Sequence, residues 1–79
     1  MSELSTLRWR SRRGMRELDV VLVRYLDQHY ATATDQERDV FKALLELEDP
    51  RLYALVTGRE VASNPEQAAM IAKLVTPPA

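Results

Sequence analysis

The chain has no cysteine, one histidine and two glycines among its 79 residues. Without cysteine it can form neither a disulfide framework nor a thiolate metal site, an absence that is typical of a reducing compartment. The only histidine, His29, lacks a second imidazole or thiolate to complete a metal site, so a structural or surface role is expected for it and no metal centre is predicted. Gly14 and Gly58 lie too far apart to form a dinucleotide fingerprint or a phosphate loop.

Long apolar segments are also missing. No run approaches the roughly 20 residues of a transmembrane helix, and the N-terminus lacks the apolar stretch of a signal peptide. The sequence therefore predicts a cytoplasmic protein that does not insert into a membrane. One domain spanning residues 1–79 is expected, with frayed ends at residues 1–3 and 76–79.

Catalytic residues in a recognisable arrangement are likewise absent. A chain of this size leaves no room for a cleft between domains. No serine is arranged in sequence with histidine and acid partners for nucleophilic catalysis. The protein is not expected to be an enzyme.

Hydrophobic periodicity of the helical kind is present throughout, and no segment alternates as a half-buried strand does. With 46% hydrophobic residues, the chain is predicted to form a compact all-α domain of five helices. The first helix is expected to end near Gly14, which suits the left-handed position after a helix end. The second helix is expected from residue 15 or 16 to about residue 30, with one apolar stripe: Leu18, Leu22, Tyr25, Leu26 and His29.

Start and stop signals delimit the other three helices. Thr34 and Glu37 have the spacing of a reciprocal capping box at the start of the third helix. Asp49 is predicted to cap the fourth, with a proline in the first position, and Gly58 to end it. Asn64 is expected to cap the fifth helix in the same way. Its inward positions are predicted to be Ala68, Ile71, Ala72, Leu74 and Val75.

An arginine cluster lies between residues 8 and 16 and makes residues 1–24 basic, with a net charge of +3 against −4 for the remainder. One interpretation is a set of helix-end cations in which Arg13 pairs with Glu17. Such an exposed pair contributes only about 0.3 kcal/mol to stability. Binding to nucleic acid is disfavoured by the overall charge of −1 and by Glu17 and Asp19, which repel phosphates. Trp9, if exposed among the arginines, would be an interaction hot spot. The acidic residues 46–49 are interpreted as a solvated helix end.

The segment from Trp9 to Asp19 contains the sequence Arg13-Gly14-x-x-Glu17. It resembles the hallmark Arg-Gly-x-x-Glu motif of the small FAD assembly factors of succinate dehydrogenase. The resemblance continues along nearly the whole chain, through Leu44-Leu45-Glu46, Asp49-Pro50-x-Leu52-Tyr53, Thr57-Gly58 and Pro65-Glu66.

The resemblance implies a non-catalytic helper that binds the flavoprotein subunit of succinate dehydrogenase, and often that of fumarate reductase, and promotes covalent attachment of FAD. The helper is not expected to hold FAD stably, and the client supplies the histidine that is linked to the flavin. The implied partner-binding residues are Arg13, Gly14 and Glu17, flanked by Arg12, Arg16 and Trp9.

A working mechanism follows from the motif. Arg13 is expected to reach a carboxylate or carbonyls of the client, Glu17 to orient Arg13 or bind a client arginine, and Gly14 to allow close approach of the two backbones. Two alternatives stay open. The first is a regulatory binding protein of antitoxin type that acts on a membrane-associated toxin, since some relatives of the family have been labelled antitoxins. The second is an arginine-led nucleic-acid binder.

Overall fold

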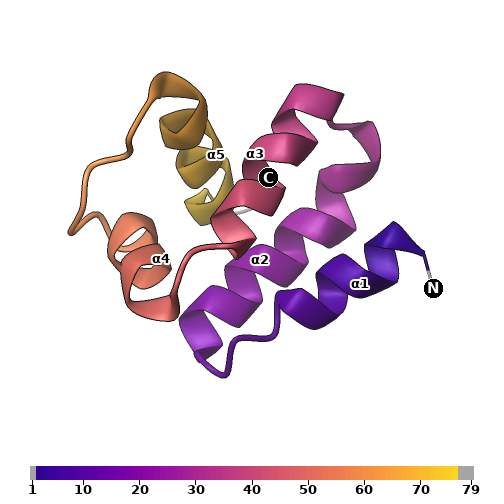
Figure 1. The fold of residues 1–79 in the computed structure, drawn as a ribbon, viewed down its shortest axis with the longest axis horizontal. Coiled ribbons are helices and arrows are strands. Elements are labelled where there is room, and N and C mark those ends of the chain that lie inside the picture. Colours follow the sequence, from indigo (N-terminus) through magenta and orange to yellow (C-terminus); the bar gives the residue numbers. More distant parts are fainter. Residues whose placement is uncertain (1, 77–79) are drawn as a thin grey trace.

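The structure, a computed structural model, describes residues 2–76 and consists of helices joined by short connections (Figure 1). The α-helices are α1 (Glu3–Arg10), α2 (Arg16–Gln28), α3 (Asp35–Leu45), α4 (Asp49–Val56) and α5 (Pro65–Val75), and a 3-10 turn, η1, covers Tyr30–Thr32. α2 crosses the middle of the molecule and contacts α1, α4 and α5, while α3 packs on α5. The all-α, five-helix prediction is confirmed. Among residues 2–76, none of the helices combines the length and the apolar character needed to cross a bilayer.

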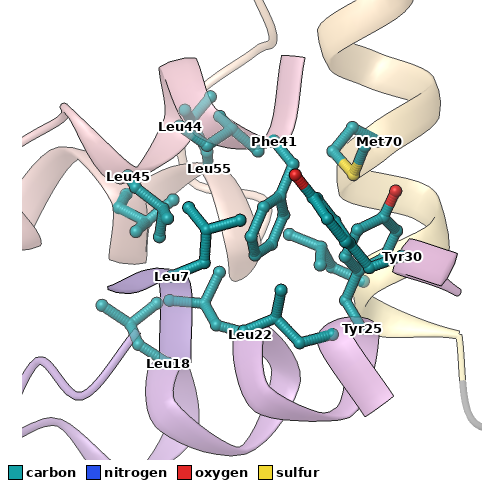
Figure 2. Packing of buried hydrophobic residues seen from close by; sticks show 13 residues of the cluster. Leu7, Leu18, Leu22, Tyr25, Tyr30, Phe41, Leu44, Leu45, Leu55 and Met70 are labelled. Atoms are coloured by element: carbon teal, nitrogen blue, oxygen red, sulfur yellow. The ribbon is translucent and has the colours of Figure 1, made fainter. Parts of the chain in front are cut away.

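The core is built from one apolar face of each helix. Figure 2 shows leucines from α1, α2, α3 and α4 converging on the aromatic rings of Tyr25, Tyr30 and Phe41. Tyr25 stacks on Phe41 with 4.6 Å between ring centroids, and Tyr30 meets Phe41 edge-on at 6.1 Å. Such pairs stabilise a core beyond the area they bury. The predicted stripe of α2 is confirmed, with His29 half-buried at its end.

Two of the predicted helix starts have the expected side-chain caps. The Thr34 hydroxyl accepts the backbone N–H of Glu37 at 3.1 Å, and the Asn64 side chain accepts that of Gln67 at 2.8 Å. The reciprocal half of the Thr34 capping box does not form. The Glu37 carboxylate instead accepts hydrogen bonds from the Tyr25 hydroxyl and the Lys73 ammonium group.

The start of α4 differs from the prediction. Glu48 occupies the cap position, makes no side-chain cap, and Asp49 is the first helical residue. Asp49 therefore does not occupy the cap position, and its carboxylate instead accepts a hydrogen bond from a distant arginine. At the other end Gly58 has a φ of 79°, and the Arg59 N–H bonds the Ala54 carbonyl at 2.8 Å. The positive φ of Gly58 and this bond are those of a Schellman motif, and the predicted end of the helix at Gly58 is confirmed.

The end of α1 lies earlier than the sequence indicated. The helix ends at Arg10, and Ser11, rather than Gly14, occupies the cap position. Ser11 is fully buried, and both its N–H and its hydroxyl donate to the Leu7 carbonyl, at 2.9 and 2.8 Å. This local pairing closes the helix before the glycine is reached.

The inward face of α5 is also corrected. Met70 and Leu74 are buried and Ile71 is half-buried, whereas Ala68, Ala72 and Val75 are exposed. One turn separates Met70 from Leu74, so these long side chains occupy the stripe, and the alanines lose little by facing solvent.

The predicted fraying of residues 1–3 and 76–79 falls partly outside the described residues and stays a prediction. Glu3 lies in α1, where its carboxylate accepts the Tyr30 hydroxyl at 2.8 Å, and the Thr76 hydroxyl donates to Ala72 at 2.6 Å. Met1 and residues 77–79 lie outside the described residues.

Glu37 joins three helices, because its carboxylate on α3 binds Tyr25 of α2 and Lys73 of α5. The Tyr25 hydroxyl, followed by Lys73, holds the pKa of Glu37 below its usual value. Burial and the same carboxylate raise the pKa of Tyr25 well above its ordinary value. Tyr25 therefore stays a neutral donor while Glu37 is the ionised acceptor.

A pH titration of stability tests this junction. The folded state lowers the pKa of Glu37, so its ionised form contributes stability above the unfolded pKa, and this is lost as pH falls through the folded pKa. Glu37→Gln should therefore have a lower free energy of unfolding than the parent near neutral pH. The difference between the two free energies, the stability gap, should narrow below about pH 4. Urea unfolding at several pH values measures this gap. A gap that stays constant into acid would contradict the proposed role of the carboxylate.

Candidate protein-docking site

The predicted site residues lie between the last turn of α1 and the first turn of α2. Trp9 is 75% exposed, and Arg12, Gly14, Arg16 and Glu17 are also exposed. Within residues 2–76, the side chains of Arg12, Arg16 and Glu17 make no hydrogen bond or ion pair. The segment thus presents two free cations, one free carboxylate and a large aromatic ring to solvent.

Arg13 is the exception, because its guanidinium group points into the protein. Nε donates to the Asp49 carboxylate at 2.8 Å, Nη1 to the Leu45 carbonyl at 2.8 Å, and Nη2 to the Leu47 carbonyl. Nη1 also reaches the Arg10 carbonyl at 3.3 Å. Only 14% of the side chain is exposed. The expected pairing of Arg13 with Glu17 is therefore wrong, since the corner between α3 and α4 offers both a carboxylate and free carbonyls.

The connection that carries Arg13 is also fixed from α2. The Arg13 backbone N–H donates to the Asp19 carboxylate at 2.7 Å. Asp19 lies in the first turn of α2, where a carboxylate also favours the helix dipole. The Asp19 carboxylate thus holds the loop to α2, while the Arg13 side chain holds it to the α3–α4 corner.

Gly14 occupies the next position and has a φ of 81°. A Cβ added to Gly14 would meet no atom within 4 Å, so the glycine is required by its backbone conformation and not by crowding. The space beside this backbone is open to an incoming molecule.

A shallow hollow of about 360 Å³ lies beside the motif. It is lined by residues of two segments: Trp9, Arg10, Arg12 and Arg13 from the first, and Leu45 and Asp49 from the second. Arg10 crosses the edge of the hollow to pair with Glu46 at 2.5 Å. The hollow is therefore formed by two segments more than 30 positions apart in sequence.

The acidic residues 46–49 thus have a different role from the one predicted. Glu46 pairs with Arg10 at the end of α1, and Asp49 pairs with Arg13 of the α1–α2 connection. Both Glu46 and Glu48 are exposed. Sequence reasoning did not place Leu45, Leu47 or Asp49 at the site. The one sequence signal for the contact of Asp49 with the arginine segment was charge, since residues 1–24 are basic and the remainder of the chain is acidic.

His29 lies away from the motif at the end of α2, with its ring centroid 5.7 Å from that of Tyr25. Among the described residues, no group of three or more histidine, cysteine, aspartate or glutamate side chains is placed to hold a metal ion.

Comparison with known proteins places this geometry in context. Residues 5–77 match the family model described as "Flavinator of succinate dehydrogenase". A FAD assembly factor SdhE from Xylella fastidiosa strain 9a5c is 46% identical over 78 residues, which cover 99% of this chain and 80% of the relative. The Shewanella oneidensis protein of the same name is 39% identical, with coverage of 94% and 90%. The Vibrio cholerae protein is 44% identical, with coverage of 87% and 80%.

These relatives bear the name of an assembly factor and give no support to the antitoxin alternative. The family model covers nearly all of the chain, including the whole segment from Trp9 to Asp19 and the α3–α4 corner. The chain belongs to the family of succinate dehydrogenase flavinators, the FAD assembly factors.

Proposed function

We propose that the protein is a non-catalytic assembly factor that binds the flavoprotein subunit of succinate dehydrogenase and promotes the covalent attachment of FAD to it. Family membership supports the activity. The observation that supports the location of the site is the exposed segment around Gly14, whose free charges and open backbone suit a protein partner.

The docking face consists of Gly14 and Glu17, with Trp9, Arg12 and Arg16 at its flanks. Glu17 can accept hydrogen bonds from a client arginine or lysine, and Arg12 and Arg16 can donate to client carboxylates. Trp9, 75% exposed, can bury a large apolar area at low cost in conformational entropy. Arg13 belongs to this site because its side chain points into the protein and bonds the α3–α4 corner.

The helper acts by orientation rather than by chemistry of its own. Attachment requires a client histidine to be held near the flavin while negative charge develops on the ring system, so positioning and electrostatics determine the rate. Bracing the client supplies the positioning. Consistent with this role, the reacting histidine belongs to the client, and His29 takes no part.

The finer assignments are part of the same proposal. The flavoprotein subunit of fumarate reductase is a second client, the helper does not hold free FAD stably, and the protein acts in the cytoplasm. Titration with free FAD and parallel assays with both flavoproteins test the first two points.

Gly14 and Gly58 form a matched pair for testing the site. Both have a φ near 80°, both are exposed, and an added Cβ meets no atom at either position. Gly14→Leu and Gly58→Leu should each lower the free energy of unfolding by about 1–2 kcal/mol through the same backbone strain. Only Gly14→Leu should slow flavinylation, by about tenfold or more, because only its side chain lies on the docking face.

The assay mixes the purified apo flavoprotein, FAD and helper, and follows the protein-bound flavin fluorescence after denaturation. Thermal unfolding confirms that both variants are folded at the assay temperature. Equal flavinylation by the two variants would contradict the assignment of the docking face.

Glu17 and Glu66 provide a second matched pair, because each is an exposed carboxylate at the second position of its helix. Substitution by glutamine removes the same favourable interaction with the helix dipole in both cases. Glu17→Gln should weaken binding of the flavoprotein by about tenfold, since a charge-assisted hydrogen bond to the client is lost. Calorimetric titration measures the affinity, which Glu66→Gln should leave unchanged. Equal affinities for the two variants would remove Glu17 from the site.

The nucleic-acid alternative makes a different prediction from the same residues. Binding led by Arg12 and Arg16 would weaken steeply with salt and would be indifferent to the Gly14→Leu substitution. A salt titration with duplex and single-stranded oligonucleotides separates it from flavoprotein binding.

A further inference from the structure

The Arg13 guanidinium has little capacity left for a partner. Arginine has five N–H donors, and within the described residues Arg13 makes four side-chain hydrogen bonds to its own chain. A client that used Arg13 directly would have to break bonds made by a side chain of which only 14% is exposed. The motif arginine is therefore placed to hold the site rather than to touch the client.

Its bonds go to a point where two helices end and begin. The Leu45 and Leu47 carbonyls lie at and beyond the C-terminal end of α3, where backbone acceptors lack partners in the helix and the helix dipole favours a cation. Asp49 lies in the first turn of α4. One side chain thus fixes the α3–α4 corner against the loop that carries Gly14.

A neighbouring ion pair joins the same two segments but lacks these properties. Arg10 binds Glu46 with 37% and 69% of the two side chains exposed, and this single bond is screened by solvent. Exposed pairs of this kind contribute little. The corner therefore has one partly buried junction with several bonds, at Arg13, and one weak junction beside it, at Arg10.

We propose that Arg13 is a positioning residue that acts through Asp49, and that the α3–α4 corner, residues 45–49, is the second half of the docking face. The inference rests on the proposed function. Arg13 and Asp49 preset the distance between Gly14 and the corner and keep the hollow beside Trp9 open. The client then meets both segments as one rigid surface, without the entropic cost of ordering the loop on binding.

A double-mutant cycle tests this coupling. Arg13→Ala, Asp49→Ala and the double variant are compared in affinity for the apo flavoprotein. The control is Glu60→Ala, which removes a single exposed ion pair with Arg51 outside the docking face. Each single substitution should weaken binding by about tenfold, and the double variant should bind no more weakly than either, because the residues act as one unit. Glu60→Ala should bind within about twofold of the parent.

Two further measurements separate positioning from general destabilisation. Flavinylation at saturating helper should approach the parental rate for Arg13→Ala and Asp49→Ala, because docking is weakened and the client's chemistry is intact. Amide hydrogen exchange should quicken at residues 12–15 and 45–49 and stay unchanged in α5. Should the alanine variants fail to fold, Arg13→Lys and Asp49→Asn take their place, since each keeps one bond of the junction.

Three outcomes would overturn the proposal. Normal affinity for Asp49→Ala with lost affinity for Arg13→Ala would make Arg13 a direct client contact. Additive losses in the double variant would show that the two residues act separately. Lowered thermal stability with unchanged affinity for the apo flavoprotein would show that Arg13 and Asp49 contribute only to folding. A failure of the proposed function itself is distinguishable, because Gly14→Leu and Glu17→Gln would then also leave flavinylation unchanged.

Discussion

The junction between Arg13 and Asp49 is the interaction on which the site depends. It joins residues 36 positions apart, and the same guanidinium also binds the carbonyls at the end of α3. With the Asp19 carboxylate on the Arg13 N–H, the α1–α2 connection is fixed from two directions. An exposed loop that contains a glycine would otherwise be mobile, and a mobile loop binds less tightly because its order must be established on binding.

Much of the fold could be predicted from the sequence because its determinants are local. The caps at Thr34 and Asn64 and the stop at Gly58 act within one helical turn. Errors arose where a distant or competing contact decided the outcome. Asp49 was expected to cap α4, but its carboxylate is held by Arg13, and the local bonds of Ser11 end α1 before Gly14.

The exposure of charged residues in the segment could be expected from the sequence, and the inward course of the Arg13 side chain could not. Arg12 and Glu17 are exposed, as charged side chains usually are, and Trp9, whose exposure the sequence left open, is exposed as well. Nothing in the sequence around Arg13 indicates that its side chain turns inward, because its acceptors lie at Leu45, Leu47 and Asp49. In the proposed site the motif combines two physical tasks: Gly14 and Glu17 present the docking surface, and Arg13 fixes this surface to the rest of the domain.

The central claim is that the face made by residues 12–17 and the α3–α4 corner docks the flavoprotein subunit of succinate dehydrogenase. Amide hydrogen exchange of the protein with and without the apo flavoprotein tests it most directly. The account predicts slowed exchange at residues 12–17 and 45–49 in the complex, with unchanged exchange in the α4–α5 connection around Gly58. Protection centred on that connection, or no protection at either half of the docking face, would contradict it.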